Sequence, residues 1–577
     1  MSADERTKKM DLEQAFHEID EALNTLNQKK MDWVTMPLEK KIKLLAMVYQ
    51  GVLNTAESQV ASALSAKGLP TESHLASEDW LGGPYANARV IGTLIEALES
   101  LRDNGHTGVS SKDAYVRPNG QVAIKVLPKR ITDHILVNGF KGEVRLQAHV
   151  DLEHWQDRCA LVYKNPPESG AISLVLGAGN VASIGLLDVI HKLYLEAQVS
   201  ILKFNPVNEY LAPHYHEILK PLIDEGFVRL VTGGAEEGKY LCAHEMIDEI
   251  HITGSDRTHD AIVYGVGEEG ARRKASDDPI CEKRVTSELG NVSPVIIVPG
   301  SWTASEIKFQ ATNIATMMYN NVGFNCNAAR VLIMQSGWPQ RRALLDAIRE
   351  VLSTLEARPS YYPGAEERFE RFICSHEGAE KIIPQSFDKV DGALPIGLVV
   401  DVDPLDQEHL CFREEAFCAM TATTNLEAAD AESFLKAATR FANEVLWGTL
   451  NATIIIDPRV EKRSNKELED AIDELRYGSI CVNHWPALSY GLGSTTWGAY
   501  PGHTRDDIQS GVGVVHNTYL LEDVEKTVIR GPFTMWPNPP WFVTHKRPVE
   551  MAKALLKTTL RPSLLDLLRL FPHALRG

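Results

Sequence analysis

The chain has 577 residues, of which 44% are hydrophobic and 24% charged, and this ordinary balance predicts globular domains with sizeable cores. The formal net charge of -18 repels the phosphate backbone of nucleic acids, so we expect no nucleic-acid partner. A charged N-terminus, no apolar run of about 18 residues, and eight cysteines without CxxC or zinc-ligand spacing predict a cytoplasmic protein with no signal peptide, membrane span, disulfide framework or metal site.

Helices are predicted for the first part of the chain. Apolar residues recur at helical spacing in 11–28, 37–54 and 84–102, with charged residues between them. A Gly-Gly-Pro run precedes the third segment and places Pro84 at a helix start. Nothing in these helices indicates chemistry, so we expect them to be structural.

Strands are predicted next. Residues 121–128, 142–150 and 159–163 are apolar runs rich in β-favouring side chains, which indicates strands or a hairpin arm. From residue 171 onward, strand-like runs alternate with helical stretches, and this rhythm is typical of a parallel sheet with crossover helices. The four strand-like runs are AISLVLGAG, VSILKFN, VRLVTGG and EIHITGS.

The carboxyl ends of these four runs indicate a ligand site. Each end is glycine-rich or polar, and ligands of open parallel sheets bind at the carboxyl ends of the strands. We therefore predict a nucleotide-sized site between 177 and 255. One interpretation is a Rossmann loop, because residues 177–182 (GAGNVA) match GxGxxA after a strand. That interpretation fits less well, because the next strand ends at Lys203 without the acidic residue that would bind the ribose.

A second region of apolar strands and helices covers 285–515, so we place a domain boundary near 285. Its strand-like runs are SPVIIVPG, RVLIMQ, TATTN, NATIIID and SICVNHW. The charged insert 267–280 before this boundary is predicted to be a loop. The tail 531–577 is rich in proline and tryptophan and then becomes basic.

Four segments resemble motifs of the aldehyde dehydrogenase superfamily. Residues 321–326 (NVGFNC) resemble N-x-G-Q-x-C, and residues 288–291 (ELGN) resemble E-L-G-G. Residues 414–417 (EEAF) resemble E-E-x-F, and residues 253–255 (TGS) resemble F-T-G-S. The four segments follow the order of the family, and the resemblance covers about 110 to 520.

The resemblance implies catalytic roles for three residues. Cys326 matches the nucleophile, whose thiolate attacks an aldehyde carbonyl and then holds the acyl group as a thioester. Glu288 matches the general base that activates water to release the acid. Asn180 matches the asparagine that, together with the backbone N–H of Cys326, forms the oxyanion hole.

The resemblance also implies an NAD or NADP site, with a small aldehyde as substrate. Lys203 matches the lysine that contacts the adenosine ribose. Gly254 and Ser255 would lie by the pyrophosphate at a helix start, where backbone N–H groups favour anions. Glu415 would hold the nicotinamide ribose, and Phe417 would pack beside the nicotinamide ring.

The implied fold class is α/β, with a parallel-sheet cofactor domain, an α/β catalytic domain and a β oligomerisation arm. The expected domains are an NAD(P)-binding domain with the N-terminal helices (1–136 and 166–285), a catalytic domain (286–510), the arm (137–165 and 511–535) and a basic helical tail (536–577). The arm implies a homodimer or homotetramer.

The sequence departs from the family pattern at several positions. Phe324 replaces the glutamine before the nucleophile. Pro206 replaces the ribose-binding glutamate, which leaves the choice between NAD and NADP open, with Asn205, Asn208 or Glu209 as substitutes. The aromatic residues Phe324, Trp485 and Trp497 are interpreted either as the lining of a tunnel for a hydrophobic aldehyde or as core residues.

Three alternatives stay open at this point. The enzyme could be a CoA-dependent acylating dehydrogenase on the same fold, or the chain could be a non-catalytic scaffold that kept the fold.

In the tail, residues 541–577 combine leucines at helical spacing with basic side chains. They are interpreted either as a contact with an anionic membrane surface or, preferably, as helices packed on the protein's own acidic body or on a partner subunit.

Overall fold

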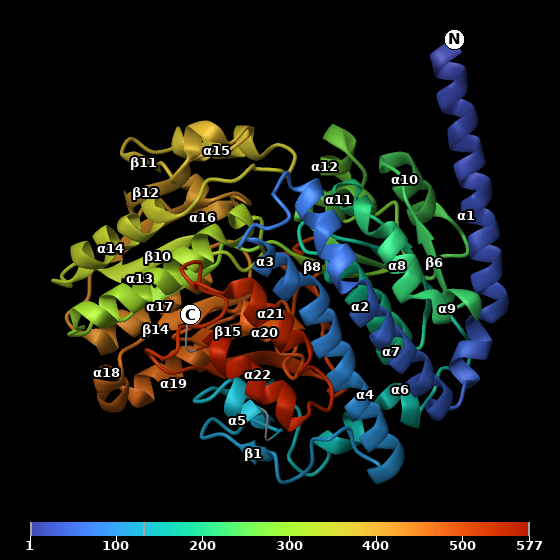
Figure 1. Ribbon diagram of the computed structural model, residues 1–577, viewed down its shortest axis with the longest axis horizontal. Coiled ribbons are helices and arrows are strands. Elements are labelled where there is room, and N and C mark those ends of the chain that lie inside the picture. Colours follow the sequence, from blue (N-terminus) through green and yellow to red (C-terminus); the bar gives the residue numbers. More distant parts are fainter. Residues whose placement is uncertain (1–2, 131–132, 575–577) are drawn as a thin grey trace.

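The computed structural model describes residues 3–130 and 133–574 and has an α/β architecture built on two main sheets (Figure 1). The six-stranded sheet has the order β17-β8-β7-β4-β5-β6. Its strands are β4 (Ile172–Leu176), β5 (Val199–Lys203), β6 (Val228–Val231), β7 (Glu249–Gly254), β8 (Arg284–Leu289) and β17 (Gly511–Val512). The accompanying helices are α7 (Ile184–Glu196), α8 (Ala212–Ile218), α9 (Lys220–Asp224), α10 (Ala235–Ala243), α11 (Asp256–Val263) and α12 (Gly267–Ala275).

The strands β4 to β8 run parallel, as the alternation of strands and helices predicts. In register, Leu176 pairs with Lys203, and Thr253 pairs with Glu288. The carboxyl ends of these strands therefore meet at one edge of the sheet, where the chain carries its polar and glycine-rich turns.

The eleven-stranded sheet has the order β1-β2-β3-β19-β15-β14-β9-β10-β13-β12-β11. Its strands are β1 (Ala114–Val116), β2 (Val122–Leu127), β3 (Lys141–Leu146), β9 (Pro294–Ile297), β10 (Val331–Gln335), β11 (Ala379–Ile382), β12 (Ile396–Val402), β13 (Met420–Leu426), β14 (Asn451–Ile455), β15 (Ser479–Val482) and β19 (Val524–Arg530). The helices of this part are α13 (Ala304–Tyr319), α14 (Arg341–Thr354), α15 (Ala365–Ile373), α16 (Leu410–Arg413), α17 (Ala431–Glu444), α18 (Pro458–Arg463), α19 (Asn465–Glu474) and α20 (Ala487–Gly491). The central strands are parallel and almost wholly buried, because helices cover the sheet.

Two strands of the segments expected to form a separate arm, β3 and β19, lie inside this large sheet. β19 pairs in parallel with β15 of the same chain, with Ser479 opposite Thr527, and β3 pairs antiparallel with β19. β1 and β2, which the sequence placed with the cofactor domain, continue the sheet beyond β3. The short strands β16 (Trp497–Gly498) and β18 (Val514–Val515) pair separately. The homodimer or homotetramer stays a prediction.

The N-terminal helices and the tail pack on the two halves of the molecule, and the first helix lies at the outer edge of the cofactor half (Figure 1). They comprise α1 (Ala3–Thr35), α2 (Leu38–Ala66), α3 (Ala76–Trp80), a π-helical turn η1 (Leu81–Tyr85), α4 (Ala86–Asn104), α21 (Pro548–Leu556) and α22 (Leu564–Ala574). α1 runs along β5, β6 and α10 at the edge of the cofactor half. α2 packs on α4 and α8, so these helices join the N-terminal part to the cofactor half.

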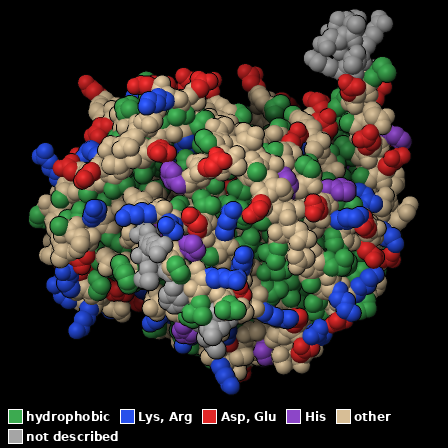
Figure 2. Space-filling model, in the orientation of Figure 1, with side chains coloured by type: hydrophobic (Ala, Val, Ile, Leu, Met, Phe, Trp, Pro, Cys, Tyr) green, Lys and Arg blue, Asp and Glu red, His purple; other side chains and the backbone are tan. Residues whose placement is uncertain are grey.

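The tail packs on the protein's own N-terminal helices. Met551 and Leu555 of α21 share an apolar cluster with Leu81 and Tyr85 of η1. On the face that Figure 2 shows, basic and acidic side chains are interspersed. None of the helices in residues 3–130 and 133–574 is both long and apolar enough to cross a bilayer. Packing agrees with the preferred interpretation of the tail, while contact with a membrane surface stays a prediction.

Two local expectations were wrong. Residues 159–163 do not form a strand, because Ala160 takes a left-handed conformation and the short helix α6 (Leu161–Lys164) follows. The insert 267–280 begins with α12 instead of a loop. Acidic residues in the first turn of α12 and basic residues in its last turn suit the helix dipole and pair along one helix face.

The boundary suggested near 285 falls inside β8, which stays in the six-stranded sheet until Leu289. The chain crosses to the large sheet only between β8 and β9. Glu288 therefore stands at the last strand end of the cofactor half and faces the catalytic half. The division into domains itself stays a prediction.

Candidate active site

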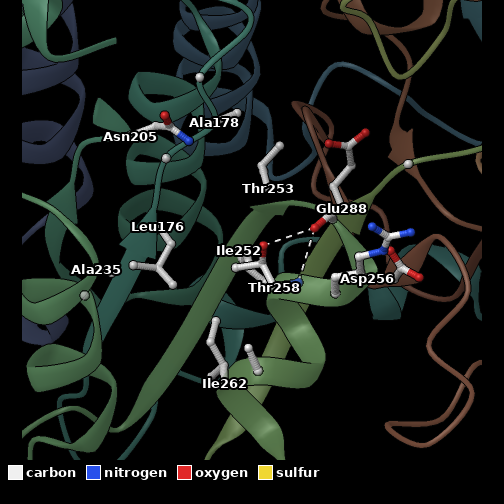
Figure 3. A pocket seen from close by; sticks show the side chains of 18 of the residues that line it. Leu176, Ala178, Asn205, Ala235, Ile252, Thr253, Asp256, Thr258, Ile262 and Glu288 are labelled. Atoms are coloured by element: carbon white, nitrogen blue, oxygen red, sulfur yellow. Dashed lines mark hydrogen bonds between the residues drawn. The ribbon is translucent and has the colours of Figure 1, made fainter. Parts of the chain in front are cut away.

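A cavity of about 1560 Å³ lies at the carboxyl ends of the parallel strands, against the loops of the catalytic half. Ala178 and Asn205 lie on the turns after β4 and β5, and α11 begins below them with Asp256 and Thr258 (Figure 3). The structure brings all eight residues singled out in the sequence to the wall of this cavity: Asn180, Lys203, Gly254, Ser255, Glu288, Cys326, Glu415 and Phe417. Their chemical roles stay predictions.

The loop that carries Cys326 has an unusual backbone. After α13 ends at Tyr319, three successive residues take left-handed conformations: Asn321 at φ 51°, Val322 at φ 55° and Gly323 at φ 71°. This conformation is unfavourable for a β-branched valine, by about 1–3 kcal/mol. A Cβ at position 323 would lie 2.4 Å from the carbonyl oxygen of Cys418, so only glycine fits there. Such a turn persists only where surrounding contacts hold it.

Asn321 is the residue that holds the turn. Its backbone N–H donates to the Glu78 carboxylate (2.8 Å), and its side-chain oxygen accepts from Lys67 Nζ and from the Tyr361 hydroxyl (both 3.1 Å). Its side-chain amide donates to the carbonyl oxygen of Asn180 (3.0 Å). Asn321 thus links the loop 320–326, called the nucleophile loop below, both to the N-terminal helices and to the turn that carries Asn180.

Asn180 is held close to the nucleophile loop. Its Nδ2 donates to the carbonyl oxygen of Phe324 at 2.9 Å, and its own carbonyl accepts from the Tyr361 hydroxyl at 3.2 Å. The Asn180 amide has two N–H groups, so one remains for a substrate oxygen. Asn180 lines the same cavity as Cys326.

The tunnel interpretation of the aromatic residues fails for two of three. Phe324 is fully buried among the rings of Tyr361, Tyr362 and Phe417, and Trp485 is buried with its indole N–H bonded to the carbonyl oxygen of Asn327 (2.7 Å). Neither residue lines the cavity. Both are core residues. The glutamine position is thus occupied by an aromatic packing residue that stiffens the loop.

Trp497 is the exception, because it contacts the site. Its indole N–H donates to Glu288 Oε1 at 3.0 Å, and it packs in a small apolar cluster beside Cys326.

Glu288 and Cys326 lie close together in the wall of the cavity. Burial raises the pKa of Glu288 to about 7, against the opposing hydrogen bonds from Trp497 and from the Cys326 thiol. Burial also raises the pKa of the Cys326 thiol, and the neighbouring Glu288 carboxylate raises it further. The thiol therefore keeps its proton until a base takes it, and the carboxylate beside it titrates near neutral pH.

Glu288 borders a second cavity of about 320 Å³ on its other side. This cavity is lined by polar residues of β7 and β8, among them His251 and Thr286, whose side chains hydrogen bond at 2.9 Å. Thr286 and Glu288 are two residues apart on β8 and so project from the same face of the sheet. Glu288 therefore borders both cavities.

The surroundings of Glu415 indicate whether a dinucleotide fits the large cavity. Its Oε1 is buried, makes no hydrogen bond and lies 3.8 Å from Arg330 Nη2, and the side chain lines the large cavity. Burial raises the pKa of Glu415 to about 7, partly offset by Arg330. A Cβ at Gly290 would lie 2.0 Å from Glu415 Oε2, so Gly290 makes room for the carboxylate. An orphaned acceptor at a cavity wall suits a ribose hydroxyl.

The other end of the cavity also fits a dinucleotide. The Ser255 hydroxyl caps α11 by accepting from Thr258 N (3.2 Å), and the first turn of α11 faces the cavity (Figure 3). Lys203, Lys239 and Lys283 line the cavity beyond it. These groups suit the phosphates and the adenosine ribose.

The suggested substitutes for the missing ribose glutamate do not all reach the cavity. Asn205 lines it, but its side-chain oxygen caps its own turn through Val207 N (3.0 Å). Asn208 donates to the Ala178 carbonyl, and Glu209 accepts from Gly233 N (2.7 Å); neither lines the cavity. No carboxylate takes the place left by Pro206 in the turn after β5.

The sequence did not single out the residues behind the nucleophile loop. Lys67, Glu78 and Asp79 lie on or beside helices expected to be structural, and Arg358 lies in a loop. A weak signal was available, because charged residues are expensive where a helix is otherwise buried. Asn321, which contacts Lys67 and Glu78, lies 254 and 243 residues further along the chain.

Comparisons with known proteins agree with this geometry. A family model described as "Aldehyde dehydrogenase family" matches residues 199–363. N-succinylglutamate 5-semialdehyde dehydrogenase of Sphingopyxis alaskensis is 24% identical over 318 residues, which is 51% of this chain and 60% of that protein. The protein of the same name from Novosphingobium aromaticivorans is 32% identical over 128 residues, 22% of this chain and 23% of the relative. The chain thus matches less than two thirds of the length of either relative.

Solved structures share the fold over most of the chain. NADP-dependent glyceraldehyde-3-phosphate dehydrogenase from Bacillus halodurans, complexed with NADP, is 15% identical, covers 89% of this chain and 91% of its own, and has a TM-score of 0.59. Glyceraldehyde-3-phosphate dehydrogenase GapN from Methanocaldococcus jannaschii, also complexed with NADP, is 15% identical, covers 89% and 94%, and has a TM-score of 0.58. At this identity the likeness shows the fold, and it confirms the expected α/β class.

Residues 199–363 match the aldehyde dehydrogenase family, and the fold of the chain is similar to that of the solved dehydrogenases named above.

The cofactor assignment of Glu415 can be tested directly. Glu415→Gln replaces the buried acceptor with a weaker one, and we expect it to lower the affinity for NADH or NADPH about 10-fold. Titration of nicotinamide fluorescence measures this affinity. The matched control is Glu408→Gln at the cavity mouth, whose side chain is 84% exposed and should bind as the wild type does. Equal dissociation constants for Glu415→Gln and the wild type would remove Glu415 from the cofactor site.

Proposed function

We propose that this chain oxidises an aldehyde to its carboxylic acid with NAD or NADP, through a thioester on Cys326. The observation that carries the proposal is the Glu288–Cys326 pair at the inner end of a cavity whose outer end suits a dinucleotide. The cysteine nucleophile, the thioester and the cofactor assignments are parts of this proposal.

The first step uses the pair itself. Glu288 takes the thiol proton, and the Cys326 sulfur attacks the aldehyde carbon, so that a C–S bond forms and the carbonyl electron pair moves to oxygen. The free N–H of Asn180 Nδ2 and the backbone N–H of Cys326 donate to this oxyanion. The loop contacts of Asn180 favour this role, because they fix the donor before substrate arrives.

A bound nicotinamide cofactor supplies the acceptor for the hydride that leaves the aldehyde carbon. The carbon is then held as a thioester. Glu288 first releases the thiol proton to solvent and then takes a proton from water, so that hydroxide attacks the thioester carbon. The C–S bond breaks, the acid leaves, and Glu288 returns its proton to the Cys326 thiolate. The second cavity beside Glu288 gives water a path to the base while the large cavity is filled.

The two rival functions are weaker. A CoA-dependent acylating enzyme passes the thioester to CoA and has no need of a water-activating carboxylate, yet Glu288 has a pKa suited to that work. A scaffold has no need of a buried thiol–carboxylate pair, which is costly to keep. Neither rival has an observation of its own in favour.

The substrate class has less support than the type of reaction. With Phe324 and Trp485 assigned to the core, the argument for a hydrophobic aldehyde loses most of its support. The two relatives named above act, by their names, on a semialdehyde, which carries polar groups. A test panel therefore pairs simple aldehydes of increasing chain length with semialdehydes.

The proposal predicts cofactor reduction that depends on aldehyde and on Cys326. We expect the full chain to form NADH or NADPH, followed by its near-ultraviolet absorbance, with at least one aldehyde of the panel and without CoA. Cys326→Ala should lose this activity, whereas Cys242→Ala, at the outer end of the same cavity, should keep it. A strict requirement for CoA would favour the acylating enzyme. Unchanged turnover in Cys326→Ala would refute the mechanism.

The general base predicts a pH profile. Because Glu288 must be ionised to accept a proton and its pKa is about 7, kcat should rise with pH through about 7 and level off above it. Glu288→Gln should lower kcat by about 10²- to 10⁴-fold and remove this limb. Glu282→Gln, another cavity-lining glutamate, is the control and should keep both rate and profile. A Glu288→Gln variant with the wild-type profile would exclude this carboxylate as the base.

A further inference from the structure

A buried cluster of charged side chains lies directly behind the nucleophile loop. Lys67 Nζ donates to Asp79 Oδ1 at 2.7 Å, and Arg358 Nη1 donates to Glu78 Oε2 at 2.7 Å. These four side chains are only 3–13% exposed. Two cations and two anions balance, so the cluster carries no net charge.

The cluster ends on Asn321. Glu78 Oε2 accepts the backbone N–H of Asn321, and Lys67 Nζ donates to its side-chain oxygen. The ring of Tyr361 lies beside Lys67 Nζ, 5.2 Å from the nitrogen, while the Tyr361 hydroxyl also reaches Asn321. α2, α3 and a loop of the catalytic half therefore converge on one residue of the nucleophile loop.

Asn321 needs these partners because its backbone is left-handed. After α13 ends, its N–H no longer has the carbonyl partner that a continuing helix would supply. The next residue, Val322, is left-handed as well, and Gly323 completes the turn. Without an acceptor at the N–H of Asn321, a more extended loop would be favoured, and Cys326 would move with it.

Burying four charges is expensive, and such clusters are weak evidence for stability. Burial lowers the pKa of Lys67, but the Asp79 carboxylate outweighs this effect and the pKa is raised, so Lys67 stays charged. Arg358 pairs with the Glu78 carboxylate in the same buried cluster. A cluster of this cost fits a role in fixing one conformation of the loop.

We propose that Glu78, supported by Lys67 and Asp79, is a positioning residue for Cys326: by holding the left-handed turn at Asn321 it sets the orientation of the thiol toward Glu288. The effect extends to Asn180, whose carbonyl accepts from the Asn321 side chain and whose amide donates to Phe324 of the same loop. The N-terminal helices are thereby part of the active-site scaffold. For turnover this inference rests on the proposed function, but for the geometry of the thiol it does not.

Two substitutions at one position separate positioning from stability. Glu78→Leu removes the acceptor for Asn321 N–H, whereas Glu78→Gln keeps an oxygen acceptor and loses only the charge that pairs with Arg358. Asp133→Asn is the control, because it weakens another buried ion pair, with Arg89, whose side chains are 5% and 3% exposed. Asp133 does not line the large cavity.

The measurements use the full chain and include a readout that needs no substrate. The rate of Cys326 alkylation by iodoacetamide is followed by peptide mass spectrometry, together with Tm, NADPH affinity and kcat. We expect Glu78→Leu to change the alkylation rate and lower kcat by at least about 10-fold, with NADPH affinity within about 2-fold. Glu78→Gln should recover most of the wild-type alkylation rate and kcat, although its Tm should fall like that of Asp133→Asn.

The contrary outcomes are distinct. If Glu78→Leu and Asp133→Asn lower Tm alike and both leave the alkylation rate unchanged, Glu78 only stabilises the fold and the inference is wrong. If Glu78→Gln fares no better than Glu78→Leu in alkylation, the hydrogen bond to Asn321 is not what acts, and the inference is again wrong. If the wild type oxidises no aldehyde, the proposed function fails, while the alkylation series still decides the positioning role.

Discussion

The backbone N–H of Asn321 has no helical partner, and the Glu78 carboxylate accepts its hydrogen bond at 2.8 Å. The rest of the site depends on this contact, because the turn that follows is left-handed at three successive residues and carries Cys326. The turn is also restricted at Gly323, because the carbonyl oxygen of Cys418 leaves no room for a Cβ at this position. A strained turn held from two sides can present a thiol in one orientation.

Burial then determines the chemistry that this orientation allows. In water a carboxylate near a thiol would be too acidic to act as its base at neutral pH, but burial brings the pKa of Glu288 to about 7. The same burial keeps the Cys326 thiol protonated until Glu288 takes the proton. At the opposite end of the cavity the pattern changes to lysines and a helix start, which suit phosphates. In the proposed mechanism, one end of the cavity carries out the covalent attack and the other binds the cofactor.

The sequence predicted the parts of this account that are local. Strands from 171 to 255 and the residues at their carboxyl ends follow from short runs of apolar and glycine-rich residues, so Asn180, Lys203 and Ser255 could be placed near one edge. The order of the four motifs predicted that Cys326 and Glu288 lie in the same site. Glu78 could not be found in this way, because its contact with Asn321 joins residues 243 positions apart. For Phe324 the sequence left the tunnel and core interpretations open, because an aromatic side chain in a loop looks the same in sequence whether it faces a cavity or the core. The pairing of β19 with β15 likewise depends on tertiary packing that no local pattern records.

The most direct test of the central claim is the mass of the peptide that contains Cys326. The peptide is isolated after the full chain has been mixed with cofactor and an aldehyde that the chain oxidises, and the reaction has been quenched in acid. The account predicts that this peptide gains the mass of the acyl group and that the other seven cysteines do not. Cofactor reduction with the acyl group on a different cysteine, or with no acyl-enzyme at any quench time, would contradict it.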